Sequence, residues 1–151
     1  LINRDGIYEM DFGDLETRMS EPSVTAMILC NPHNPVGRVW RIDELERLVE
    51  IANRHGVILL SDEIHSDIIY SGHHFTSLMA IDAQNHVSVI GSPAKTFGMH
   101  SISNGYVYTE NDAVLSAFKA KADGMYLAHG NAFTTFIAVS TALQPVVSVK
   151  L

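Results

Sequence analysis

Short apolar runs recur along the chain, and each one stops at a polar residue, a glycine or a proline. Runs of this length between such stops predict buried strands. The four predicted strands are residues 26–30, 57–60, 87–90 and 105–108. Residues 1–22, by contrast, are polar and irregular, and the stretch Asp11-Phe12-Gly13-Asp14 predicts only a turn there.

Apolar residues recur at helical spacing between and after these runs. Residues 43–54 predict an amphipathic helix, with acidic residues at its start and Gly56 just beyond its end. Two further helices are expected over residues 112–122 and about 132–143. Strands that alternate with helices favour right-handed crossovers, so we expect an α/β fold with a mostly parallel sheet and flanking helices. Such sheets bind ligands beyond the carboxyl ends of their strands.

Length, composition and charge narrow the class of protein. The 151 residues are 46% hydrophobic and 18% charged, which suits one domain with its own core. With 10 Lys and Arg against 17 Asp and Glu, the net charge of -7 argues against a nucleic-acid partner. The apolar runs are too short to cross a membrane, and the single cysteine, Cys30, fits a reducing cytoplasm. Because the chain begins at Leu1 and resembles the middle of a protein, we expect residues 1–151 to be a piece of a longer chain.

Polar segments follow the first two predicted strands. Asn31-Pro32-His33-Asn34-Pro35-Val36-Gly37 predicts a stiff, turn-rich loop that carries amide side chains, although an ordinary loop would have the same features. Asp62 follows the second strand, and His65 lies close behind it. A carboxylate at the end of a buried strand needs a cation or hydrogen-bond donors, but capping of a following helix explains Asp62 equally well.

The third strand leads into Ser92-Pro93-Ala94-Lys95-Thr96-Phe97, which contains the most informative lysine. Of the four lysines, Lys119 and Lys121 lie on a predicted charged helix and Lys150 lies at the C-terminus, where solvation explains them. Lys95 instead follows a buried strand through a proline turn, where a desolvated lysine can attack a carbonyl group. Considered alone, a lysine after a strand is usually a surface residue.

The three segments are more informative together than separately. An amide, a carboxylate with a histidine, and a lysine stand at the ends of three successive predicted strands. Pyridoxal phosphate requires such a set, because its aldehyde needs an amine, its pyridine nitrogen needs a carboxylate, and its ring oxygen needs hydrogen-bond donors. The pattern therefore predicts a pyridoxal-phosphate site at one edge of the sheet.

In their order and separation, the three segments resemble motifs of the fold-type I pyridoxal-phosphate enzymes, the class I/II aminotransferase superfamily. Residues 31–37 resemble the Asn-Pro-x-Asn-Pro-Thr-Gly motif of that superfamily. Residues 61–67 and 92–97 are most similar to its MalY/PatB-type cystathionine β-lyase branch. The resemblance covers about residues 8–143 and implies part of the large domain of such an enzyme, which is a three-layer α/β/α structure.

The resemblance also implies a role for each candidate residue. Lys95 would form the Schiff base with pyridoxal 5'-phosphate and then act as general base at the α carbon of the substrate. Asn34 would donate to the ring oxygen of the cofactor, and Asp62 would pair with its pyridine nitrogen. His65 stands where many relatives place a tyrosine that contacts the ring oxygen, and Ser92 matches a phosphate-binding serine.

Three positions depart from the superfamily pattern. Val36 replaces the usual threonine, and Gly98 replaces a common asparagine. Ser103 stands where many aminotransferases carry a phosphate-binding arginine, which the lyase branch commonly lacks, so this change favours a lyase. The aromatic residue that stacks on the cofactor, the glycine-rich phosphate turn and the arginine that binds the substrate carboxylate are expected outside these residues.

The resemblance implies a carbon–sulfur β-lyase of the cystathionine β-lyase type that acts on an amino acid, with a class I/II aminotransferase as the alternative. A catalytically incomplete fragment or an interaction module is the alternative of another class. A metal site is disfavoured, because the eight histidines form no HExxH motif or Cys/His cluster. By resemblance, the protein is expected to be a cytoplasmic homodimer with no nucleic-acid or membrane partner.

Overall fold

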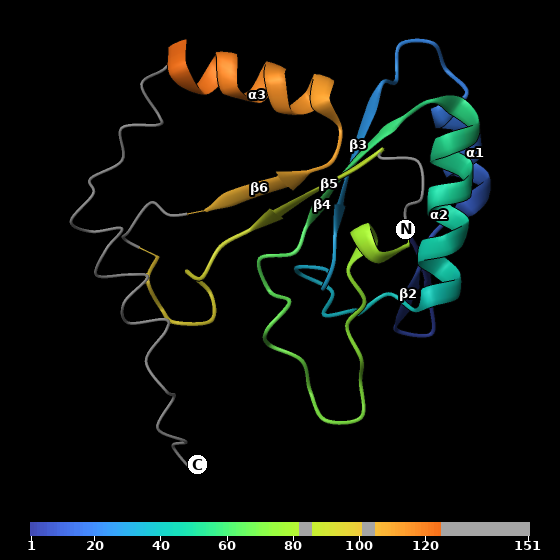
Figure 1. Ribbon diagram of the computed structural model, residues 1–151. Helices are drawn as coiled ribbons and strands as arrows, with labels where there is room; N and C mark the ends of the chain where they lie inside the picture. Colours follow the sequence, from blue (N-terminus) through green and yellow to red (C-terminus); the bar gives the residue numbers. More distant parts are fainter. Residues whose placement is uncertain (82–85, 101–104, 125–151) are drawn as a thin grey trace.

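The computed structural model describes residues 1–81, 86–100 and 105–124, and its centre is a four-stranded sheet (Figure 1). The strands are β3 (Ala26–Cys30), β4 (Ile58–Asp62), β5 (Val87–Gly91) and β6 (Tyr106–Thr109), in the order β3-β4-β5-β6. The first three run parallel, and β6 is antiparallel to β5. The predicted α/β fold with a mostly parallel sheet is confirmed, and the strands lie within two residues of their predicted bounds. The helix predicted over 132–143 falls outside the described residues.

Helix α2 (Ile42–His55) connects β3 to β4 and covers one face of the sheet. Glu44 lies in its first turn and accepts a hydrogen bond from the backbone N–H of Arg41, which satisfies one donor at the helix start. Gly56 ends the helix in a left-handed conformation with φ of 66°, which a glycine adopts without steric cost. The predicted helix and its glycine stop are therefore confirmed.

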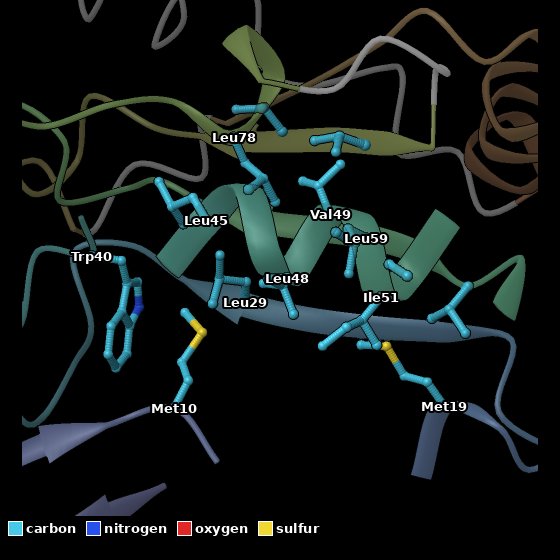
Figure 2. Packing of buried hydrophobic residues seen from close by; sticks show 14 residues of the cluster. Met10, Met19, Leu29, Trp40, Leu45, Leu48, Val49, Ile51, Leu59 and Leu78 are labelled. Atoms are coloured by element: carbon cyan, nitrogen blue, oxygen red, sulfur yellow. The ribbon is translucent and has the colours of Figure 1, made fainter. Parts of the chain in front are cut away.

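The hydrophobic core forms where α2 meets the sheet. Figure 2 shows side chains of α2 packed against residues of β3 and β4, with methionines from the N-terminal segment below them. The most deeply buried core side chains include Trp40, Leu45, Leu48, Val57, Leu59, Leu78 and Val87. Removal of this much apolar surface from water is the main stabilising contribution of the described fold.

The N-terminal residues form regular structure, so the prediction of an irregular segment with a single turn was wrong. β1 (Ile2–Arg4) and β2 (Ile7–Glu9) make a hairpin whose turn residues, Asp5 and Gly6, both have positive φ. α1 (Phe12–Met19) follows, and Asp11 caps it by accepting a hydrogen bond from the N–H of Asp14. The polar residues that suggested a turn are thus the start of a helix that packs against α2 (Figure 1).

The strands predicted as buried are covered mainly on one face. Leu29 is buried toward α2, whereas its neighbour Ile28 has 68% of its surface exposed. The remaining helix, α3 (Asp112–Gly124), contacts β6, and a 3₁₀ turn, η1 (Leu78–Ala80), lies against β5. Among the described residues, no helix combines the length and the apolar character that a membrane span requires.

Candidate functional site

The carboxyl ends of β3, β4 and β5 lie level with one another. Cys30 is opposite Asp62, and Asp62 is opposite Ile90. Backbone hydrogen bonds continue this alignment past the strands, from Asn31 N–H to the Asp62 carbonyl and from Glu63 N–H to the Ile90 carbonyl, each 2.9 Å. The three polar segments singled out in the sequence therefore begin side by side at one edge of the sheet.

The two asparagines of the loop after β3 have different surroundings. Asn31 is fully buried, and its amide donates to the Thr76 carbonyl (3.1 Å) and accepts from the Trp40 N–H (3.2 Å). The indole N–H of Trp40 donates in turn to the Cys30 carbonyl (3.0 Å). Asn34 is exposed, and its side chain forms no hydrogen bond with another described residue. Asn31 thus holds the loop in place, whereas the amide of Asn34 can still bind a ligand.

Asn34 and His65 line the same cavity, which has a volume of about 350 Å³. Its other lining residues are Pro32, His33, Pro35, Gly37, Arg38, Val39, Ile68, Tyr70 and His73. Asp62, Ser92 and Lys95 do not line this cavity, so the structure divides the predicted site residues between the cavity and the neighbouring strand ends.

Adjacent carboxylates at the end of β4 point to opposite faces. Asp62 is half-buried, and its Oδ1 accepts a hydrogen bond from the Ile64 N–H (3.2 Å) in a local turn rather than at the start of a helix. Glu63 is 6% exposed, and its Oε1 accepts from Ser61 Oγ (2.9 Å), Ser77 Oγ (3.0 Å) and the Leu78 N–H (3.0 Å). Glu63 therefore holds the loop to the core, while Oδ2 of Asp62 has no hydrogen-bond partner among the described residues.

Glu63 was not among the residues predicted from the sequence, although the sequence carries a signal for its burial. Side chains along a strand alternate between faces, and Leu59 lies in the core against α2. Counting in steps of two from Leu59 places Ser61 and Glu63 on the core face and Asp62 on the other face. The observed burial of Ser61 and Glu63 follows this alternation.

Lys95 lies in a compact turn after β5. The N–H groups of Phe97 and Met99 donate to the carbonyls of Pro93 (3.0 Å) and Ala94 (2.9 Å), and Ser92 Oγ accepts from the Ala94 N–H (3.1 Å). The Lys95 side chain is exposed, and no described residue forms a hydrogen bond or ion pair with its ammonium group. The expected desolvation of this lysine is therefore not found among the described residues. Ser103 lies outside the described residues.

Two charged or titratable side chains that line the cavity, those of Arg38 and His33, stabilise the loop that forms part of its wall. Arg38 pairs with the buried Glu44 (2.6 Å), donates to the Tyr8 carbonyl, and lies 4.7 Å from the centre of the Trp40 ring. His33 packs edge-on against Trp40, and burial lowers the pKa of its imidazole. Its Nδ1 is buried and has no hydrogen-bond partner within the described part of the chain. These contacts stabilise the loop after β3 and were not predicted from the sequence.

The groups at this edge match the chemistry that pyridoxal phosphate needs. An exposed primary amine can condense with an aldehyde, a carboxylate oxygen can accept from a protonated ring nitrogen, and an amide with an imidazole can donate to a ring oxygen. No group of three or more His, Cys, Asp and Glu side chains suited to a metal ion occurs within residues 1–81, 86–100 and 105–124. The donor set therefore fits an organic carbonyl cofactor.

Comparison with known proteins gives related enzymes. The chain is 41% identical over 135 residues to cystathionine β-lyase PatB of Bacillus subtilis, which covers 88% of this chain and 35% of PatB. It is 36% identical over 132 residues to protein MalY of Escherichia coli, covering 85% of this chain and 33% of MalY. Among solved structures, cystalysin from Treponema denticola, which contains a pyridoxal 5'-phosphate cofactor, matches with a TM-score of 0.78 and 34% identity. That match covers 81% of this chain and 32% of cystalysin.

Two facts follow from these comparisons. The chain spans about a third of the length of the curated relatives that it matches. The model of the family described as aminotransferase class I and II matches residues 4–148, which is nearly the whole chain. The chain therefore belongs to the class I and II aminotransferase family.

Proposed function

We propose that residues 1–151 are the cofactor-anchoring segment of the large, three-layer domain of a pyridoxal-phosphate-dependent carbon–sulfur β-lyase that acts on an amino acid. The observation that carries this proposal is the level alignment of three strand ends, which starts the segments of Asn34, Asp62 and Lys95 side by side. The similarity to PatB, which is named a cystathionine β-lyase, and to the pyridoxal-phosphate-containing cystalysin supports the same reading.

Each residue has a defined task in this proposal. Lys95, whose side chain is exposed, would hold the cofactor through its Nζ and, once the substrate amine has displaced it, would accept the proton from the α carbon of the substrate. Oδ2 of Asp62 accepts a hydrogen bond from the ring nitrogen, while its Oδ1 stays bonded to the Ile64 N–H. Asn34 and His65, which share one cavity, donate to the ring oxygen, and Ser92 contacts the phosphate. When bound, pyridoxal phosphate supplies a ring that accepts the electrons left at the α carbon.

The second candidate function is aminotransfer, which the description of the matching family favours. Both reactions begin with removal of the α proton by Lys95, and they differ in their products. In the full-length protein with cystathionine as substrate, the lyase proposal predicts release of a thiol and ammonia without an added keto acid. Formation of a keto acid only when an acceptor keto acid is added, with no thiol or ammonia, would contradict it.

The chain alone is expected to be incomplete as a catalyst, because it spans about a third of its relatives. We therefore expect little or no turnover from residues 1–151 and activity from the full-length protein as a cytoplasmic homodimer. Sedimentation of the full-length protein tests the dimer, and a monomer that retains full activity would contradict it. Turnover by the isolated segment at the rate of the full-length protein would contradict the fragment assignment.

A further inference from the structure

One side-chain hydrogen bond joins the turn of Lys95 to the turn of His65. The hydroxyl of Thr96, the residue after Lys95, donates to Oδ2 of Asp67, two residues after His65, over 2.8 Å. Among the hydrogen bonds between described residues, it is the only one that connects residues 93–98 to another segment. Its position between the two candidate loops indicates a role in the geometry of the site.

The turn that carries Asp67 is anchored in the core at its start, although the Asp67 side chain itself is exposed. Ser66 N–H donates to the Glu63 carbonyl (2.9 Å) and Ile68 N–H donates to the His65 carbonyl (3.0 Å), so Asp67 sits in a closed turn. That turn begins at Glu63, whose buried carboxylate accepts three hydrogen bonds. The turn after β4 is therefore connected to the core through Glu63.

Thr96 lies in the turn that follows β5. The turn over residues 93–98 is closed by its own backbone bonds and continues directly from β5, and Lys95 within it is exposed. Because Thr96 is bonded covalently to Lys95, fixing Thr96 restricts the backbone dihedral angles of Lys95 and so the direction of its side chain. A carboxylate acceptor makes this a charge-assisted hydrogen bond, which is stronger than a neutral one.

We propose that Asp67 is a positioning residue: through Thr96 it fixes the turn that carries Lys95 relative to the turn that carries His65. The inference rests on the proposed function, since it matters for chemistry only if Lys95 is the cofactor lysine. Asp67 itself touches neither the cofactor nor the substrate in this role.

The first test needs no cofactor. In the cofactor-free full-length protein, hydrogen exchange of the Phe97 and Met99 amides reports how often the turn opens. Thr96→Val, which keeps the shape of threonine but removes the donor, is expected to accelerate this exchange about threefold. That factor corresponds to about 0.7 kcal/mol, near the lower end of the usual net contribution of one hydrogen bond, because this hydrogen bond is exposed. Thr96→Ser, which keeps the hydroxyl, should exchange like the unmodified protein.

Asp67→Ala removes the same hydrogen bond from the acceptor side. It is expected to accelerate exchange to the same extent as Thr96→Val, and the double variant should be no faster than either single one, since both remove the same contact. Glu46→Ala, an equal charge change at an exposed position of α2, is the matched control and should leave exchange unchanged. Unchanged exchange in Thr96→Val and Asp67→Ala, or effects that multiply in the double variant, would overturn the proposal.

The second test measures attachment of pyridoxal phosphate to Lys95 in the full-length protein. Thr96→Val and Asp67→Ala are expected to raise the dissociation constant of the cofactor about threefold, with recovery in Thr96→Ser. If the unmodified protein attaches the cofactor to Lys95 and both variants attach it equally well, the positioning role is overturned and the proposed function stands. If the unmodified protein attaches none to Lys95, the proposed function fails, and the positioning role fails with it whatever the exchange data show.

Discussion

Replacement of the buried Glu63 carboxylate tests how the loop after β4 is held. Glu63→Ala removes the common acceptor of Ser61 Oγ, Ser77 Oγ and the Leu78 N–H. The Leu78 N–H is then left buried without a partner, whereas the two hydroxyl groups can rotate toward other acceptors. Glu63→Gln keeps the size of the side chain and an acceptor oxygen, so it isolates the contribution of the negative charge.

The expected magnitudes follow from these contacts. An unsatisfied buried donor costs about 1–3 kcal/mol, and loss of two further hydrogen bonds adds about 1 kcal/mol. Glu63→Ala is therefore expected to lower the free energy of unfolding by about 3 kcal/mol. Glu63→Gln should lower it by about 1 kcal/mol, because neutral hydrogen bonds replace charge-assisted ones.

Urea-induced unfolding measures both variants on one scale. Glu46→Ala, at an exposed position, is the control and should change the free energy of unfolding by less than about 0.5 kcal/mol. If Glu63→Ala were within about 0.5 kcal/mol of the unmodified protein, Glu63 would not hold the loop to the core. Equal losses for the Ala and Gln variants would show that the charge, rather than the acceptor geometry, stabilises the loop.

Three further predictions concern the packing and the pH response of the fold. A Cβ at Gly91 would overlap the outer ring atoms of Tyr106, whose side chain is mostly exposed and can move away. Gly91→Ala should therefore lower the free energy of unfolding in urea by only about 1 kcal/mol, and by less in a Tyr106→Ala background; equal losses in both backgrounds would contradict the clash. Leu48 is fully buried, so Leu48→Ala should cost about 3 kcal/mol, and a loss below about 1 kcal/mol would contradict its place in the core. Burial lowers the pKa of His33 in the folded protein. As the pH drops through about 6.5, the unfolded chain therefore binds more protons at this residue than the folded protein does. The free energy of unfolding consequently falls as the pH drops through that value. Urea unfolding at pH 7.5 and pH 5.5 should show a smaller acid loss in His33→Phe but not in the exposed control His74→Phe, and an unchanged loss in His33→Phe would contradict the prediction.

The central strands and helix α2 could be predicted because local pattern and tertiary structure agree there. The run over β3 stops at Asn31-Pro32, and α2 carries its apolar face and its glycine stop in the sequence itself. The neighbouring positions of the Asn34, Asp62 and Lys95 segments followed from the rule that parallel strands end at one edge of a sheet.

Other features depend on contacts between residues far apart in the sequence. The buried state of Glu63 comes from Ser77 and Leu78, which no local pattern connects to it. Asp11 was read as part of a turn because the same side-chain chemistry serves turns and helix caps. The exposure of Lys95 depends on what packs over its turn, which local sequence does not determine.

The most direct test of the central claim is to locate the residue that binds the cofactor. Full-length protein is mixed with pyridoxal phosphate, treated with borohydride to make the lysine–cofactor bond permanent, and digested for mass mapping. The adduct is predicted on Lys95, absent in Lys95→Ala and retained in Lys119→Ala. An adduct on Lys119 or Lys121, or no adduct at all, would contradict the assignment of Lys95 as the cofactor lysine.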